Sequence, residues 1–218
     1  MTEIELKLVP AEAGLLDRLA DIEQLGPFVV VARHHQRQRN SFFDTRSRGF
    51  RRARVGFRRR VVEGETMAVW TLKAEGDLFR GIAIRAEVEL RLGADLPPAL
   101  TLQALRQRAD PALAEQVRDA VADGALPLAE PFLDMVTDRH ILDLRSDAAL
   151  LELALDRVTI TDSDYRELEI EVELKRGDEA ALEEARRAIE ALGEVRESSG
   201  SKLSRALDYI ERNAADVN

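Results

Sequence analysis

No cysteine occurs among the 218 residues of the chain, so a disulfide framework and a thiolate metal site are both excluded. Any metal must be held by oxygen atoms or by the histidines His34, His35 and His140. These histidines do not show the spacing of a metal-binding motif, and we assign them structural roles. The lack of thiols also fits a reducing compartment, so we expect a cytoplasmic protein.

Long apolar runs and glycine-rich loops are missing as well. No run approaches the roughly 20 apolar residues that a membrane helix needs, and the N-terminus does not resemble a signal peptide. We therefore expect no membrane partner. Neither a P-loop nor a dinucleotide-binding glycine motif occurs, so any recognition of phosphate must come from side chains.

Charge is abundant but unevenly divided along the chain. The net charge of -9 at pH 7 argues against broad binding of nucleic acid. Residues 33–60 are nevertheless strongly basic, and residues 167–197 are strongly acidic. Local charge is therefore more informative than the total.

Hydrophobic periodicity predicts a mainly extended chain with helices at its margins. The extended segments are residues 2–9, 28–44, 54–62, 66–75, 81–92, 132–145, 149–161 and 165–176. Helical patterns cover residues 15–23, 99–108, 111–123, 178–192 and 201–213. Because strands and helices do not alternate regularly, the pattern favours an α+β fold with a closed antiparallel sheet. We expect a single domain over residues 1–218, with a helical insertion near 99–123 and closing helices near 178–213.

Several strands carry ionisable residues on one face and apolar residues on the other. In the first strand, Glu3, Glu5 and Lys7 alternate with apolar residues. The strand over residues 167–175 repeats this pattern, with glutamates at 167, 169, 171 and 173. We expect these two strands to be neighbours. An open sheet with one solvated face would alternate in the same way, and this alternative stays open.

The sorting of charge argues for a bound cation. Two carboxylates about 4 Å apart repel by roughly 4 kcal/mol at an effective dielectric constant of about 20. A magnesium ion would offset this cost, because it prefers oxygen ligands and commonly bridges to substrate phosphate. Arg58 and Arg60 share a face of one strand, and Lys73 lies on the next. Such basic groups bind phosphate oxygens, so phosphate is the expected ligand.

Six blocks of sequence, in this order, resemble the CYTH domains, or triphosphate tunnel metalloenzymes. They are Glu3-x-Glu5-x-Lys7, Asn40 to Thr45, Phe57 to Arg60, Thr71-Leu72-Lys73 with Arg85-x-Glu87-x-Glu89, Glu169-x-Glu171-x-Glu173, and Ser201 to Arg205. The resemblance covers nearly the whole chain. It implies a closed eight-stranded antiparallel β-barrel, or tunnel, with a charged interior and peripheral helices, and a linear triphosphate as the substrate.

The resemblance also implies roles for individual residues. Mg²⁺ or Mn²⁺ is expected on Glu3, Glu5, Glu169 and Glu171, with Glu87 and Glu89 as further candidates. Asp156 is either a tunnel acid or a turn-side residue. The expected cradle for the triphosphate is Lys7, Arg58, Arg60, Lys73, Arg85, Arg139, Lys202 and Arg205. We expect Arg33, Arg37 and Arg39 to cover the outer surface.

Members of this family differ in chemistry. The helical insertion and the Ser-Lys-x-x-Arg ending look most like the bacterial inorganic triphosphatase branch, which implies metal-dependent hydrolysis of tripolyphosphate to pyrophosphate and phosphate. The alternatives are an adenylyl cyclase, a thiamine triphosphatase, or a polyphosphate- or nucleotide-binding module without turnover. Two positions depart from the family pattern: Arg59 replaces an apolar residue, and Thr137 stands where some members have a lysine. No general base is assigned.

Overall fold

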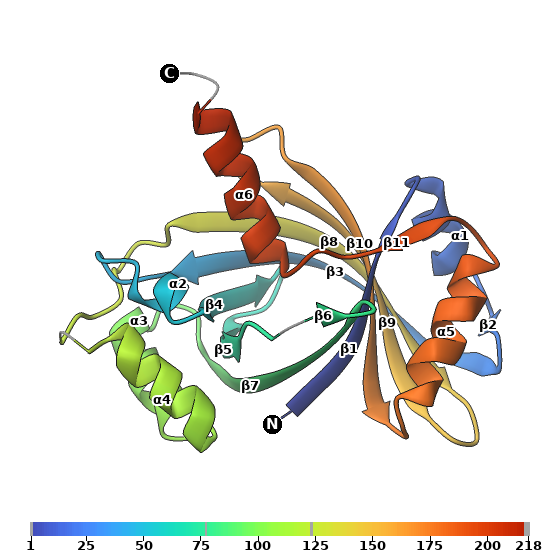
Figure 1. The fold of residues 1–218 in the computed structure, drawn as a ribbon, viewed down its shortest axis with the longest axis horizontal. Coiled ribbons are helices and arrows are strands. Elements are labelled where there is room, and N and C mark those ends of the chain that lie inside the picture. Colours follow the sequence, from blue (N-terminus) through green and yellow to red (C-terminus); the bar gives the residue numbers. More distant parts are fainter. Residues whose placement is uncertain (1, 77, 123, 216–218) are drawn as a thin grey trace.

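A computed structural model describes residues 2–76, 78–122 and 124–215 of the chain, and a β-barrel forms its centre (Figure 1). The barrel strands are β1 (Thr2–Pro10), β3 (Phe28–Phe43), β4 (Val55–Val62), β5 (Met67–Ala74), β7 (Ile82–Gly93), β8 (Leu133–Arg145), β9 (Leu150–Ile160) and β10 (Arg166–Arg176). They follow one another in the order β1-β10-β9-β8-β3-β4-β5-β7, and β7 pairs with β1 to close the ring. The expected eight-stranded antiparallel barrel is thus confirmed.

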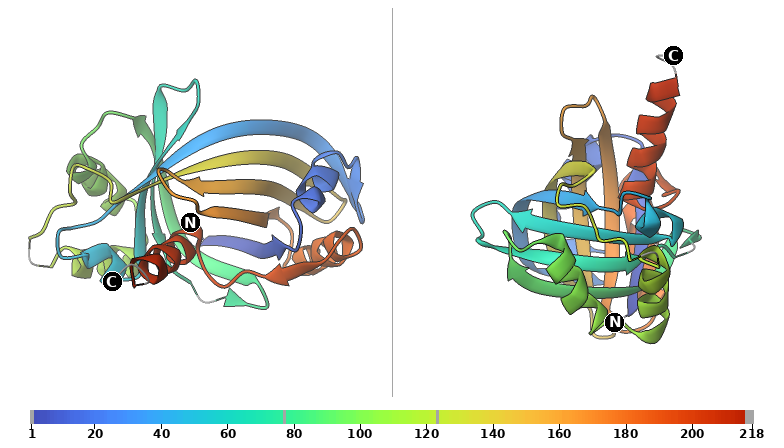
Figure 2. Two further views of the ribbon diagram at one scale, coloured as in Figure 1. Left: turned by 90° about the horizontal axis from the view of Figure 1, so that it is seen from above. Right: turned by 90° about the vertical axis from the view of Figure 1, so that its left-hand side faces the viewer.

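Helices and short strands surround the barrel. The helices are α1 (Gly14–Ala20), α2 (Gly49–Arg52), α3 (Pro98–Arg106), α4 (Pro111–Ala120), α5 (Ala180–Glu190) and α6 (Lys202–Ala215). Short strands β2 (Gln24–Leu25), β6 (Leu78–Phe79) and β11 (Val195–Glu197) pair with β3, β7 and β1, respectively. Helices α1 and α5 lie at one end of the molecule and α3 and α4 at the other (Figures 1 and 2). Among the described residues, no helix combines the length and apolar character that crossing a membrane requires.

The helix expected over residues 15–23 ends at Ala20, earlier than its apolar spacing predicts. The following residues turn back as a hairpin, in which Gln24 pairs with Val29. Gly26 makes this turn possible, because its φ of 55° lies in the left-handed region that glycine adopts without strain. Pairing with β3 therefore overrides the local helical pattern.

Apolar side chains on the outer face of the barrel are buried beneath the helices. Leu6 and Ile170 pack with Leu182 of α5 in one core, and Trp70 packs with Leu113 of α4 in a second. All five are fully buried. Because successive side chains of a strand point to opposite faces, this outer core directs the intervening charged residues into the barrel. The alternative of an open sheet with a solvated charged face is therefore wrong.

The last helix reaches the inner face of the barrel. Leu203 and Ala206 of α6 pack against inward-facing residues that include Phe42 and Met135. Phe42, Met135 and Leu203 also line the cavity described below. The first turn of α6 therefore forms part of the cavity wall.

Candidate active site

The barrel encloses a cavity of about 680 Å³ whose wall is formed by the inward side chains of the strands. Its acidic lining residues are Glu3, Glu5, Glu65, Glu75, Glu87, Glu89, Glu152, Glu171 and Glu173. Its basic lining residues are Lys7, Arg58, Arg60, Lys73, Arg85, Arg91, Arg139, Lys175 and Lys202. The structure thus brings most of the residues predicted for metal and phosphate into one chamber. Asp156 and Glu169 lie deeper in the wall, where both are fully buried.

The first and tenth strands are direct neighbours, as their matching charge patterns predicted. Lys7 is paired with Glu171 across the antiparallel ladder, and Glu5 is paired with Glu173. Strand β7 flanks β1 on its other side, where Glu3 lies opposite Arg85. Glu3 therefore faces a cation of β7, whereas Lys7 is the cation that β1 presents to the acids of β10.

One group of three carboxylates surrounds the ammonium of Lys73 on β5. Its Nζ donates to Glu3 and lies 3.2 Å from both Glu5 Oε1 and Glu87 Oε2. Burial by itself would raise the pKa of Glu3, but the charge of Lys73 holds this pKa below its usual value. Three acids from β1 and β7 thus converge on one position that already holds a cationic group.

A second group of three carboxylates surrounds the ammonium of Lys202 at the start of α6. Nζ of Lys202 contacts Glu169, lies 2.8 Å from Glu171 Oε1 and lies 3.0 Å from Asp156 Oδ2. Carboxylate oxygens of these three acids all lie within 4.8 Å of one another. Burial alone would lower the pKa of Lys202, but the three acids raise it above its usual value. The final motif of the sequence thus supplies a cation to the acids of β9 and β10.

Lys7 lies between these two groups. Its ammonium contacts Glu171 and lies 3.2 Å from Glu5 Oε2 and 3.8 Å from Glu169 Oε2. Burial would raise the pKa of Glu171, but Lys202, Lys7 and Arg139 hold it well below the usual range. Glu5 and Glu171 are both among the acids on which the resemblance places a metal, and the ammonium of Lys7 lies between them.

Two arginines fix the buried acids of the wall. Arg139 donates from Nε and Nη2 to the two oxygens of Asp156, at 2.7 and 2.6 Å, and Nη2 also donates to Glu171 at 2.6 Å. Arg205 of α6 donates to Glu167 and, at 2.6 Å, to Glu169. Asp156 is therefore a tunnel-side acid and not a turn residue. Arg205 lies behind the cavity wall, where it positions Glu169.

Arg58 and Arg60 of β4 direct their guanidinium groups to one acid. Their Nη2 atoms lie 3.5 and 3.2 Å from the same oxygen of Glu89, which also accepts a 2.8 Å hydrogen bond from Thr71. Burial, together with the charge of Arg58, lowers the pKa of Arg60 to about 10. Arg85 is also buried, with Nη1 at 3.6 Å from Glu5. Positive charge on this side of the cavity is thus only partly balanced.

Glu87 differs from the acids around it because burial dominates its ionisation. Burial, with Glu3 and Glu89 nearby, raises the pKa of Glu87 to about 8, although Lys73 acts in the opposite direction. The pKa of Glu89 is lowered instead, since Arg60 and Arg58 outweigh the effect of burial. Burial thus favours the protonated form of Glu87, whereas the neighbouring cations favour the ionised forms of Glu3 and Glu89.

Glu87→Gln should remove part of the pH dependence of stability in metal-free protein. Because its folded pKa is raised from 4.5 to about 8, the native state keeps a proton that the unfolded chain releases. The stabilisation is complete below pH 4.5 and is lost as the pH rises through 8. Between about pH 5 and 8, wild type should lose on the order of 3–4 kcal/mol more unfolding free energy than the variant, since one pKa unit corresponds to about 1.4 kcal/mol. Urea unfolding in EDTA measures this difference, and parallel pH curves for the two proteins would contradict it.

The two departures from the family pattern have different surroundings. Arg59 points to the outer face, where its guanidinium lies 5.5 Å from the ring centroid of Phe43 and 5.6 Å from that of Trp70. A cation–π contact thus replaces apolar packing there. Thr137 lines the cavity and accepts a 3.3 Å hydrogen bond from Asn40.

Some neutral polar residues of the site were not predicted. Gln36 and Gln38 line the cavity, and Ser198 lies 3.2 Å from Glu169. The glutamines alternate with exposed residues of β3. This alternation indicates the inner face, but a search for charged residues alone does not find them. Ser198 lies in the loop after β11 and belongs to no strand pattern. Two arginines expected on the surface lie outside the cavity, where Arg33 donates to backbone oxygens near the end of α1 and Arg39 donates to Asp134.

The donor set suits a hard divalent cation. Carboxylate oxygens are the ligands that Mg²⁺ and Mn²⁺ prefer, and at both groups an ammonium marks a point where three acids hold positive charge. Glu3, Glu5 and Glu87 line the cavity, whereas Asp156 and Glu169 are fully buried and bonded to basic side chains. The assignment of individual ligands stays a prediction.

Comparison with known proteins identifies a family that the chain matches. Residues 1–207 match the family described as the CYTH domain. No curated protein matches the chain significantly. A candidate adenylyl cyclase from Hippeastrum, HpAC1, described as having a dominant triphosphatase activity, has a TM-score of 0.66 at 21% identity, with 93% of each chain covered.

Two further solved structures have the same fold. A candidate adenylate cyclase from Bacillus halodurans has a TM-score of 0.53 at 19% identity, covering 94% of this chain and 97% of its own. The PH1819 protein from Pyrococcus horikoshii has a TM-score of 0.53 at 15% identity, covering 95% and 99%. At these identities the likeness shows the fold alone. The match over residues 1–207, on a closed barrel with a charged cavity, shows that the chain belongs to the CYTH domain family.

Proposed function

We propose that this protein is a divalent-metal-dependent triphosphatase that hydrolyses inorganic tripolyphosphate to pyrophosphate and phosphate. The observation that carries the proposal is the partly balanced positive charge around Arg58 and Arg60, which meet at one oxygen of Glu89. The lowered pKa of Arg60, at about 10, reflects burial and repulsion by Arg58. A polyanion bound beside these groups would remove that repulsion.

The size and lining of the cavity suit a chain of phosphates. A volume of about 680 Å³ lies in the range of small-molecule sites, roughly 300–1,000 Å³. Lys7, Lys73, Arg85, Arg139 and Lys202 join the two arginines in the lining and would bind and straighten the anion. Phosphoryl transfer depends mainly on such positioning and on electrostatic stabilisation, so the site needs few covalent catalysts.

We propose that Mg²⁺ or Mn²⁺ binds on the acidic side of the cavity. Glu3, Glu5, Glu169 and Glu171 would hold it, with Glu87, Glu89 and Asp156 as further ligands. Such an ion supplies positive charge and Lewis acidity to phosphoryl transfer. Because Lys7, Lys73 and Lys202 already contact these acids, the same ammonium groups would reach the phosphates next to the metal side.

Two features support the bacterial inorganic triphosphatase branch of the family. The helical insertion is present as α3 and α4, which pack on the outside of the barrel. The Ser-Lys-x-x-Arg motif begins α6, where Lys202 lines the cavity and Arg205 binds Glu169. Both features lie in the two segments on which the resemblance to this branch is based.

A substrate panel tests the proposal. Purified protein should release phosphate from tripolyphosphate with Mg²⁺ or Mn²⁺, faster than from ATP or thiamine triphosphate, and EDTA should abolish release. Cyclic AMP formed from ATP would overturn the hydrolase assignment in favour of a cyclase. Saturable binding of tripolyphosphate without phosphate release from any of the three compounds would favour a binding module.

A further inference from the structure

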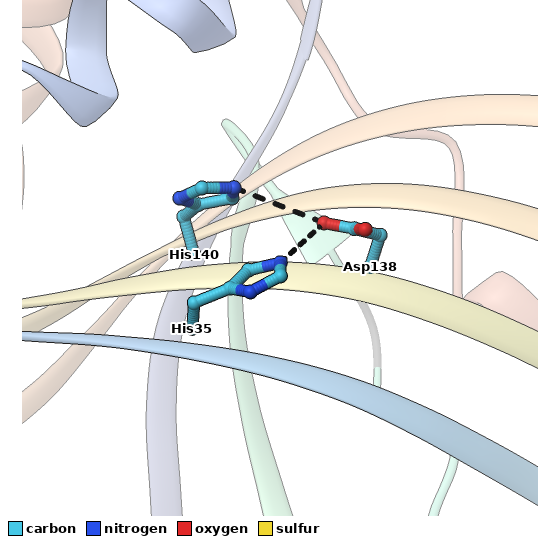
Figure 3. A group of neighbouring side chains, drawn as sticks. All are labelled: His35, Asp138 and His140. Atoms are coloured by element: carbon cyan, nitrogen blue, oxygen red, sulfur yellow. Dashed lines mark hydrogen bonds and ion pairs between the residues drawn. The ribbon is translucent and has the colours of Figure 1, made fainter. Parts of the chain in front are cut away.

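A group of two imidazoles and a carboxylate lies on the outer face of the barrel, between β3 and β8 (Figure 3). Nε2 of His35 lies 2.9 Å from Oδ1 of Asp138, and Nε2 of His140 lies 3.8 Å from the same oxygen. The centroids of the two imidazole rings are 4.4 Å apart. We call these three residues the histidine cluster. From the sequence we predict structural roles for the histidines, because they lack the spacing of a metal-binding motif. His35 and Asp138 are 103 positions apart in the chain.

Strand pairing explains how the cluster forms. His35 and His140 lie directly opposite each other in the antiparallel ladder, so their side chains meet on one face. Asp138 precedes His140 by two residues, which places it on the same face. One ligand atom from each residue lies within 4.8 Å of the other two. The cluster is therefore held by two paired strands and not by a loop.

The spacing suits a four-coordinate metal ion. Zinc binds nitrogen and carboxylate oxygen at about 2.0–2.2 Å, so its tetrahedral ligand atoms lie about 3.4 Å apart. The observed distances from Asp138 to the two imidazoles, 2.9 and 3.8 Å, lie on either side of that value. Three protein ligands leave a fourth position for water or another ligand, as in open zinc sites.

The cluster is accessible and separate from the cavity. Side-chain exposures are 55% for His35, 46% for Asp138 and 39% for His140. Arg139, which stands between the last two in sequence, lines the cavity instead. Arg157 is paired with Asp138 across the ladder to β9 but donates to Asp17 at 2.6 Å, so this guanidinium is bound to a different acid.

We propose that the histidine cluster binds a divalent transition-metal ion, with zinc as the best match. Imidazole ligands suit zinc, copper and nickel, whereas magnesium and calcium prefer sites built from oxygen alone. The outer site and the cavity therefore select different metals. This proposal does not depend on the triphosphatase activity.

Zinc titration of the full chain tests the proposal in excess Mg²⁺, which occupies oxygen-only sites. Isothermal calorimetry should detect a zinc site in wild type that is weakened at least about tenfold in His35→Ala and in His140→Ala. His34→Ala is the matched control, because His34 is equally exposed and lies 3.6 Å from Asp143, outside the cluster. It should bind zinc as wild type does.

A spectroscopic arm identifies the ligands. Co²⁺ in place of zinc should give the visible absorption of a tetrahedral site in wild type and in His34→Ala, and should lose it in His140→Ala. Circular dichroism checks that each variant is folded. Equal zinc affinity in wild type and His140→Ala would overturn the proposal, as would a zinc site that disappears in Glu5→Gln but persists in His140→Ala.

Discussion

Glu5→Gln should reduce the release of phosphate from tripolyphosphate by at least about a hundredfold, a loss typical of removing one strong electrostatic contact from an active site. Glu5 is 3% exposed, and its oxygens lie 3.2 Å from both Lys7 and Lys73 and 3.6 Å from Arg85. Glutamine keeps the shape of the side chain but removes its charge. Three cations then lose a shared counter-charge, and the proposed metal loses a hard oxygen ligand.

The dependence of activity on metal concentration distinguishes the loss of a metal ligand from the loss of a counter-charge for the three cations. If Glu5 binds the metal, the variant should need more Mg²⁺ or Mn²⁺ for half-maximal activity, and Glu5→Asp, which keeps the charge, should recover part of the rate. A rate that stays low at every metal concentration would point to the three cations instead. Phosphate release across a metal titration measures both effects.

Arg37→Ala is the control for Glu5→Gln. Arg37 is exposed on β3, and this variant should keep near-normal activity. Thermal unfolding should confirm that Glu5→Gln is folded at the assay temperature. Near-normal turnover in folded Glu5→Gln would remove Glu5 from the metal site.

The inward charges could be predicted from sequence because side-chain alternation is a local property. Glu3, Glu5 and Lys7 point to one side of any strand that contains them, whatever that strand pairs with. The pairing of β1 with β10 followed from a second strand of the same pattern, and the structure confirms it. Periodicity and matching charge therefore predict the charged inner face, whereas the resemblance to the CYTH domains predicts the eight-stranded tunnel and most of the individual site residues.

The particular ion pairs depend on the register of the ladders in the closed barrel, which side-chain alternation does not specify. Lys73 meets Glu3 and Glu5 because β7 pairs with β1 on one side and with β5 on the other. The register of those ladders decides which acid each cation reaches. The histidine cluster illustrates the same limit, since His35 and His140 become neighbours only through the ladder between β3 and β8.

Arg139→Met should destabilise the protein by about 3–5 kcal/mol, the cost of breaking a buried ion pair from one side. Arg139 donates to both oxygens of Asp156 and to Glu171, and Asp156 is fully buried. Burial would raise the pKa of Asp156, but Arg139 and Lys202 hold it below its usual value. Without the guanidinium of Arg139, the buried negative charge of Asp156 is balanced by fewer positive charges. Urea unfolding measures the loss of free energy.

The double variant Arg139→Met/Asp156→Leu separates stability from function. It replaces the pair by apolar side chains of similar volume, a change that is often neutral or stabilising, so most of the lost unfolding free energy should return. Hydrolysis of tripolyphosphate should not return, because the cavity still lacks a guanidinium that we assign to the phosphate cradle. Arg139→Lys should lie between wild type and Arg139→Met in both measurements, since an ammonium keeps the charge but cannot reproduce the two-pronged contact. If the double variant regains activity together with stability, Arg139 serves only to hold Asp156 and Glu171, and the cradle must be assigned without it.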